Sequence, residues 1–290
     1  MKPEIIELAD HRTRGKSRVR VAVSSDLHFD AAGRLTSPAT ITALVEEMRA
    51  AEPAAVVLAG DIGHPLENFK RCLAAFQSIR VPVAVLAGNH DVWRDEGGLG
   101  SRELWEHGLA DATREAGALW LEDGELRIGD VAVVGSLAWY DYSAAPEHLR
   151  YPDGHFARIK GSLNNDAEMI DWPWTDVEFA WRLRQGLVDK LARLDRDASI
   201  RSVVVTTHVP IFEEQMTRKP GSHRWELSNA YFGNLTTGAA VARCAKVRTV
   251  VSGHTHCGRR GTVVRDAAPP IEVHVVGSEY GRPAFVVIDC

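Results

Sequence analysis

Five short motifs place carboxylate, amide and imidazole side chains at the ends of apolar segments. In chain order they are Asp26-Leu27-His28, Gly60-Asp61, Gly88-Asn89-His90-Asp91, His208 after two threonines, and Gly253-His254-Thr255-His256. Mixed oxygen and imidazole donors suit Mn, Fe, Zn or Ni better than Ca or Mg, and no thiolate is required. The motifs therefore predict a metal-dependent hydrolase with a dinuclear site.

Each motif taken alone is weak evidence. A single histidine near a strand end is more often a hydrogen-bonded loop residue, and Asp or Asn after Gly is a common turn former. The segment Gly88-Asn89-His90-Asp91 is more specific, because Asn89 offers a neutral oxygen ligand and leaves His90 free for proton transfer. Five such motifs in this order at strand ends are poorly explained by chance.

The elements that carry the motifs follow a regular alternation. Residues 19–24, 54–59 and 81–87 are apolar runs that each end at a motif, and residues 38–51 and 66–78 between them have helical periodicity. Continuous apolar runs that alternate with helices are typical of βαβ units in a sheet buried on both faces. Ligands of such folds bind beyond the carboxyl ends of the strands, which is where the motifs stand.

Similar apolar runs and helical segments follow along the rest of the chain. We expect helices over 101–116, 177–194 and 237–245, and strands over 131–137, 203–207, 247–252, 261–264, 271–276 and 284–288. Residues 139–174 are aromatic and irregular and are predicted to be an insertion. Because the motifs are divided between both halves, we expect one α/β domain over residues 18–290 with two packed sheets, preceded by a loose arm over residues 1–17.

Length and composition narrow the class of protein. The chain has 290 residues, of which 45% are hydrophobic and 25% charged, as in an ordinary globular protein. No stretch approaches the length of a membrane span, and the acidic N-terminal residues do not form a signal peptide. We therefore expect a cytoplasmic protein with no membrane partner. The net charge of −5 does not favour nucleic acid, although a nucleic-acid substrate stays open.

The motif set resembles that of the calcineurin-like metallophosphoesterase family, from Asp26 to His256. The resemblance implies an α/β fold of two packed mixed β-sheets flanked by helices. It also implies two sets of metal ligands that share one carboxylate: Asp26, His28, Asp61 and His256 for one ion, and Asp61, Asn89, His208 and His254 for the other. The ions would be divalent or transition metals, Mn, Fe, Zn or Ni.

The resemblance also implies a mechanism. Two ions would clamp the phosphoryl oxygens and lower the pKa of a bound water that attacks phosphorus. His90 would stay off the metals and stabilise charge or protonate the leaving oxygen. Asp91 would orient His90 or help to hold the site. The sequence departs from the family's frequent G-D-x-x-D pattern, because His64 occupies the position of the second acid. His64 is either a partner of the site or a surface residue.

Several functions remain open at this point. The leading hypothesis is a phosphodiesterase acting on a small nucleotide-like substrate, and a phosphomonoesterase is close behind. A DNA repair-type nuclease shares the ligands, and a non-catalytic scaffold of the same fold would have lost some of them. The segments 139–174 and 218–231 are candidates for substrate contacts, through aromatic rings in the first and basic side chains in the second. The oligomeric state is unknown.

Overall fold

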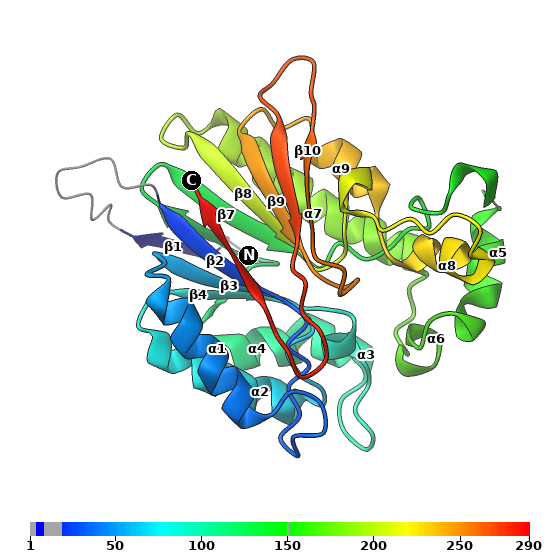
Figure 1. Cartoon of the computed structure of the whole chain (residues 1–290), viewed down its shortest axis with the longest axis horizontal. Coiled ribbons are helices and arrows are strands. Elements are labelled where there is room, and N and C mark those ends of the chain that lie inside the picture. The colour runs from blue at the N-terminus through cyan, green and yellow to red at the C-terminus, as the bar shows by residue number, and fades with distance from the viewer. Residues whose placement is uncertain (1–3, 9–18, 150) are drawn as a thin grey trace.

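Two β-sheets pack face to face and carry helices on their outer faces (Figure 1). The structure is a computed structural model that describes residues 4–8, 19–149 and 151–290. Both sheets contain parallel and antiparallel pairs. The predicted fold class, two packed mixed sheets flanked by helices, is confirmed.

The smaller sheet has five strands in the order β12-β2-β3-β4-β5. Its central strands run parallel and are rich in valine and alanine, because both faces of this part of the sheet are buried. The strand bounds are Arg20–Ser24 for β2, Ala55–Ala59 for β3, Val83–Leu86 for β4, Leu119–Trp120 for β5 and Phe285–Asp289 for β12.

The larger sheet has seven strands in the order β1-β6-β7-β8-β9-β11-β10. Its centre is the parallel set β7, β8 and β9. The strand bounds are Ile5–Leu8 for β1, Glu125–Ile128 for β6, Val131–Ser136 for β7, Ser202–Thr207 for β8, Val247–Ser252 for β9, Arg259–Val263 for β10 and Ile271–Val275 for β11.

The helices divide between the two outer faces and a lobe at one end of the sheets (Figure 1). The α-helices are α1 Pro38–Ala50, α2 Leu66–Phe76, α3 Ser101–Glu103, α4 Leu109–Glu115, α5 Asp153–Ile159, α6 Asp166–Met169, α7 Asp176–Arg196, α8 His223–Ser228 and α9 Leu235–Val241. Short turns are η1 Gln77–Ile79, η2 His90–Val92, η3 Leu104–Gly108, η4 Glu147–Leu149, η5 Lys160–Ser162, η6 Glu213–Gln215 and η7 Asn229–Tyr231.

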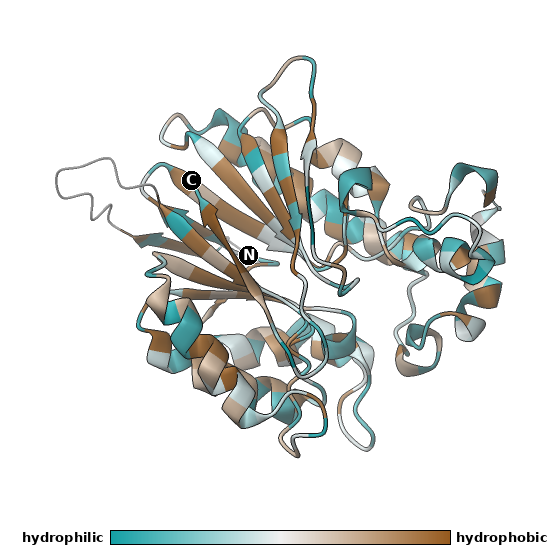
Figure 2. Cartoon of the chain, viewed as in Figure 1, coloured by the Kyte–Doolittle hydropathy of each residue, from teal (hydrophilic) through white to brown (hydrophobic). Residues whose placement is uncertain are grey.

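Three clusters of buried apolar side chains hold these elements together. In Figure 2 the strands are largely hydrophobic, and the helices around them are of mixed polarity. Helices α1, α2 and α4 pack on the outer face of the smaller sheet, and α7 and α9 pack on that of the larger. Between the sheets, Val57 and Leu86 of one meet Val133, Val204 and Val251 of the other. The packing of the two sheets on this shared core is what brings their strand ends together.

The N-terminal arm is in part a strand. Residues Ile5–Leu8 form β1 and pair in parallel with Glu125–Ile128, so the prediction of a loose arm is wrong for these residues. Ile6 and Leu8 point to the side of the sheet that packs on the core between the sheets. In the sequence, charged neighbours obscure this alternation of half-buried and exposed side chains along β1. Residues 1–3 and 9–17 of the predicted arm lie outside the described residues.

Two further expectations need correction. The predicted helix over 101–116 is divided by the π-helical turn η3 between α3 and α4. The predicted irregular insertion over 139–174 contains α5, α6 and η5, and Trp139 and Tyr140 within it are fully buried. Its aromatic residues pack with one another and with Phe179 of α7, so most of them belong to the core.

Lys190 of α7 joins the two sheets from within the core. Its buried ammonium group donates to the carbonyl oxygens of Leu121 after β5, at 2.6 Å, and of Gly135 in β7, at 2.7 Å. Burial lowers the pKa of Lys190 to about 8, although the nearby charges of Glu122 and Asp123 act to raise it. The group is therefore charged at pH 7.

We expect Lys190→Met to lower the free energy of unfolding by about 2–4 kcal/mol, because the buried carbonyls lose a charged donor. Urea unfolding at pH 7 measures the change. Gln185→Met, at an exposed position of the same helix, should stay within about 0.5 kcal/mol of the wild type. Equal stability of the two variants would contradict this role of Lys190.

Candidate metal centre

All side chains predicted for the site lie on loops that follow parallel strands, at one edge of the two sheets. The smaller sheet supplies Asp26 and His28 after β2, Asp61 after β3, and Asn89, His90 and Asp91 after β4; the larger sheet supplies His208 after β8, and His254 and His256 after β9. The loops are joined directly, since the amides of Asp26 and His28 donate to the carbonyl oxygens of Gly60 and Asp61.

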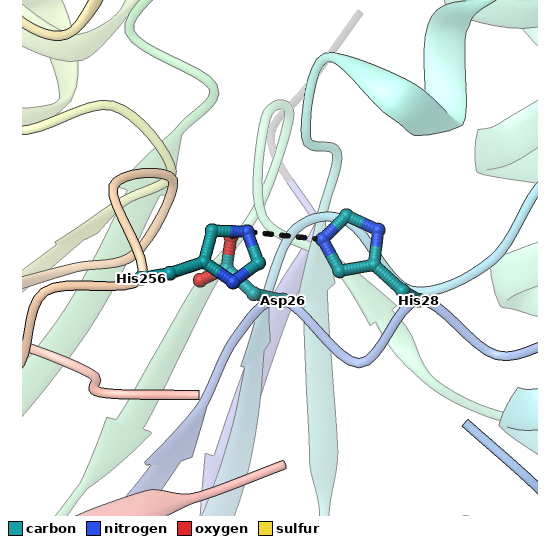
Figure 3. Close-up of side chains that lie close together, drawn as sticks. All are labelled: Asp26, His28 and His256. Atoms are coloured by element: carbon teal, nitrogen blue, oxygen red, sulfur yellow. Dashed lines mark hydrogen bonds and ion pairs between the residues drawn. The ribbon is translucent and has the colours of Figure 1, made fainter. Parts of the chain in front are cut away.

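One cluster joins Asp26, His28 and His256, whose candidate ligand atoms all lie within 4.8 Å of one another. Figure 3 shows the two imidazole rings directed toward each other, with Asp26 beside them. The Nε2 atoms of His28 and His256 are 3.3 Å apart, and His256 Nε2 lies 3.6 Å from Asp26 Oδ1. Three potential ligands from both sheets thus face one small volume.

A second cluster joins Asp61, Asn89, His208 and His254. The Oδ1 atom of Asn89 lies 3.1 Å from His208 Nε2 and 3.0 Å from His254 Nδ1. The Oδ1 atom of Asp61 lies 3.4 Å from His208 Nε2, whereas its Oδ2 atom lies 3.6 Å from His28 Nε2 of the first cluster. The two oxygens of Asp61 therefore face different clusters.

The outer nitrogens of two histidines are held by backbone carbonyls. His208 Nδ1 lies 3.0 Å from the carbonyl oxygen of Ala59, and His254 Nε2 lies 3.0 Å from that of Tyr231. Because a carbonyl oxygen only accepts, these ring nitrogens are donors, and in a neutral imidazole the other nitrogen then carries a lone pair. The lone pair of His254 Nδ1 consequently faces the oxygen of Asn89, an arrangement that a cation would stabilise.

Burial and charge oppose each other at the carboxylates. Burial raises the pKa of Asp26, and the nearby Asp61 adds to this while His208 opposes it. Burial also disfavours the charged form of Asp61, but His208, His90 and His28 outweigh it and hold the pKa of Asp61 well below its usual range. Two buried acids surrounded by imidazoles have the donor chemistry that a transition-metal ion requires.

The pKa values of the buried histidines shift in opposite directions. Burial lowers the pKa of His28 to about 3 and that of His254 to about 4, which keeps both rings neutral at pH 7. Burial acts the same way on His208, but the charge of Asp61 and the hydrogen bond to it raise the pKa of His208 to about 9. Neutral imidazoles are the form that binds metals, so His28 and His254 are already in that form, whereas His208 would have to lose a proton.

The backbone is strained where the ligands lie. Asp26, His28, Asp61, His254 and His256 all have φ between 43° and 68°, a region that residues with a side chain rarely adopt. Such strain accumulates at functional sites, where the surrounding structure enforces it.

Two glycines allow the loops to approach the acids. A Cβ atom on Gly88 would lie 2.1 Å from Asp61 Oδ1, and one on Gly253 would lie 2.3 Å from Asp26 Oδ2. No real Cβ atom tolerates these distances, so the close approach of backbone to carboxylate requires glycine at both positions.

Asp91 is bound to the backbone rather than directed at His90. Its buried carboxylate accepts from the amides of Ile62 at 2.8 Å, Gly63 at 3.0 Å and Gly88 at 2.8 Å. It therefore ties the loop after β3 to the loop after β4. Of the two roles considered for Asp91, these contacts support holding the site together.

His90 lies beside His28 and Asp61, and the candidate ligand atoms of these three residues are within 4.8 Å of one another. The His90 ring stacks on Trp93 with a centroid distance of 3.7 Å, and its Nε2 atom is 3.8 Å from Asp61 Oδ2. Its side chain keeps about a quarter of its surface exposed, at 26%, so it can reach a substrate. His64 stands nearby, with its ring edge toward Trp93 and its Nδ1 atom 3.6 Å from Asp95 Oδ1.

Three residues of the site were not predicted from the sequence. Trp93 stacks on His90, Asp166 receives a hydrogen bond from Asn89, and the half-exposed ring of Tyr280 lies against His28 and His256. Trp93 follows its motif by two positions, which is the only sequence signal among the three. Asp166 and Tyr280 are far from the motifs in sequence and are brought in by the fold.

Some side chains of the two segments expected to contact substrate are packed into the fold, whereas Tyr151, His223 and Arg224 are exposed. In 139–174, Trp139 and Tyr140 are fully buried and cannot stack on a base. In 218–231, Arg218 is held by Glu213 and Asn229, and Lys219 lies over the Trp225 ring. A cavity of about 640 Å³ beside α5 and α7 has none of the predicted metal ligands in its lining, but Tyr142 and Tyr151 of the 139–174 segment line it in part.

Comparison with known proteins identifies the group to which this chain belongs. The model of the calcineurin-like phosphoesterase family matches residues 19–258. No curated protein matches the chain. In the part of the chain that the structure describes, no helix is long and apolar enough to cross a membrane.

Solved structures share the fold at low sequence identity. A phosphopantetheinyl hydrolase from Mycobacterium tuberculosis is 20% identical with a TM-score of 0.68, and the match covers 93% of this chain and 96% of that one. A dimetal phosphatase from Danio rerio is 15% identical with a TM-score of 0.53, covering 94% and 99%. With the family match and the clustered Asp and His side chains, the conclusion is that this chain belongs to the calcineurin-like phosphoesterase family and is a phosphate-ester hydrolase.

Proposed function

We propose that the chain is a phosphodiesterase with a dinuclear centre and a small, nucleotide-like substrate. In this proposal Asp26, His28, Asp61 and His256 hold one ion, and Asp61, Asn89, His208 and His254 hold the other. The observation that carries it is the orientation of Asp61, whose Oδ1 faces His208 and whose Oδ2 faces His28. A carboxylate so placed can serve both ions.

The chemistry of the donors supports Mn, Fe, Zn or Ni as the bound metals. Two such ions, when bound, clamp the phosphoryl oxygens and lower the pKa of a bound water. The side chains then have separate tasks. Asp91 holds the loops that carry Asp61 and Asn89, and the partly exposed His90 can protonate the leaving oxygen.

The charge around the site favours a diester. The largest electrostatic influences on Asp26, Asp61 and His28 come from one another and from neighbouring histidines, with no arginine or lysine among them. A phosphomonoester carries up to two negative charges and a diester carries one. The buried acids Asp26 and Asp61 repel a dianion more strongly than a monoanion, so the diester is the first candidate and a phosphomonoesterase is the second.

The remaining alternatives have less support. A repair-type nuclease would benefit from a basic surface, and the net charge of −5 does not favour one. A scaffold would not need the donor set, which is complete. The four cysteines are free thiols, which agrees with the cytoplasmic location we propose.

The substrate class is tested with two model esters that share a leaving group. With added Mn²⁺, we expect kcat/KM for bis-p-nitrophenyl phosphate to exceed that for p-nitrophenyl phosphate by about tenfold, or about 1.4 kcal/mol in transition-state stabilisation. Steady-state assays at pH 7 measure both. A preference for the monoester would reject the diester proposal and support the phosphomonoesterase.

The shared role of Asp61 is tested by metal content. Wild-type protein should bind two Mn²⁺ ions per chain, whereas Asp61→Ala should lose at least one and lower kcat by about 10³-fold or more, because the bridge and the positioned water are lost together. Elemental analysis and circular dichroism accompany the assay. A variant that keeps two ions and near-native turnover rules out the bridging role.

The role of His90 is tested by the leaving group. His90→Ala should retain both ions and slow turnover by about 10²-fold on esters with an alkyl alcohol as the leaving group. The loss should be smaller for p-nitrophenolate, which leaves without a proton. His107→Ala, at an exposed position, provides the control. If the variant loses an ion or slows both ester classes equally, His90 is not the general acid.

A further inference from the structure

A buried carboxylate from the 139–174 segment reaches the candidate metal centre. Asp166 begins α6 and is fully buried. Its Oδ1 atom accepts from Asn89 Nδ2 at 2.9 Å and from Trp93 Nε1 at 2.7 Å, and its Oδ2 atom accepts from the Tyr140 hydroxyl at 2.8 Å. A segment more than seventy residues away in sequence is thus bonded to a candidate ligand.

These contacts determine which way the Asn89 amide faces. An indole N–H can only donate, so the Asp166 oxygen that faces Trp93 is an acceptor. The Asn89 atom directed at the same oxygen must therefore be its NH₂ group. It follows that the carbonyl oxygen of Asn89 points to the other side, where His208 and His254 lie.

The same carboxylate also holds the support of His90. Trp93, which donates to Asp166, stacks on the His90 ring at a centroid distance of 3.7 Å. One oxygen of Asp166 is thus bonded both to the amide of the candidate ligand and to the ring beneath the candidate acid. Hydrogen-bond networks in which every polar group has its partner specify one arrangement of their members.

We propose that Asp166 is a positioning residue that keeps the Asn89 oxygen turned toward the metal, so that the 139–174 segment is a structural part of the centre. This inference rests on the proposed ligand role of Asn89. Partners behind a metal ligand commonly change metal affinity by about 10–100-fold when removed. The effect of Asp166 on metal affinity should be of this size and should act through Asn89 alone.

The variants separate an acceptor role from a charge role. Asp166→Leu removes the acceptor and the charge. Asp166→Asn removes the charge but keeps an oxygen that can accept from Asn89 and Trp93, while its NH₂ group donates to the Tyr140 hydroxyl after that hydroxyl turns. Glu168→Leu, at an exposed position of the same helix, controls for the added leucine.

The experiment titrates the metal-free protein with Mn²⁺ and follows binding by calorimetry and by the electron paramagnetic resonance of the ion. We expect Asp166→Leu to weaken one of two binding steps by about 10–100-fold and to leave the other unchanged. Asp166→Asn should stay within about fivefold of the wild type, and Glu168→Leu should match it. Asp166→Leu should add no further loss to Asn89→Ala.

Each contrary result has a distinct meaning. If Asn89→Ala weakens a step and Asp166→Leu does not, Asp166 does not position the ligand. If Asp166→Asn is as weak as Asp166→Leu, the charge and not the acceptor matters, and the inference is overturned. If Asn89→Ala binds both ions normally, the ligand assignment itself has failed. Circular dichroism checks folding, and Asp166→Ala, with the same expected loss, replaces a leucine variant that does not fold.

Discussion

The burial of two carboxylates side by side is the constraint on which the site depends. Asp26 and Asp61 are almost completely removed from solvent, and the charge of Asp61 acts to raise the pKa of Asp26. Buried like charges are strongly unfavourable unless cations or hydrogen bonds compensate them. The surrounding imidazoles, the backbone amides and the strained loops all act to compensate these acids or to hold them in place.

This constraint explains why the site needs both sheets. The smaller sheet carries the acids and Asn89, and the larger sheet carries His208, His254 and His256. Neither sheet alone supplies the complete set of proposed ligands. The apolar contact between the sheets, centred on residues such as Val57 and Val204, therefore controls the geometry of the chemistry as well as the stability of the fold.

Residues behind the ligands limit how the ligands can turn. The carbonyl oxygens of Ala59 and Tyr231 hold the outer nitrogens of two histidines, and Asp166 holds the amide of Asn89. Each fixes an orientation that the ligand itself leaves free. Metal sites depend on such supporting contacts nearly as much as on the ligands. Here two of the three supports, Tyr231 and Asp166, come from segments with no motif of their own.

The sequence by itself determined the types of the candidate ligands, their order and the strands that present them, because apolar periodicity and the short motifs are local properties of the chain. It also identified the fold class, through the alternation of buried strands and helices. It did not reveal β1, whose apolar residues alternate with charged ones, or the helices within 139–174. Tertiary structure alone decided that Asp91 binds backbone amides, that Trp139 is core, and that Asp166 and Tyr280 join the site. Contacts between distant segments depend on how two sheets and an insertion pack, and no local pattern encodes that packing.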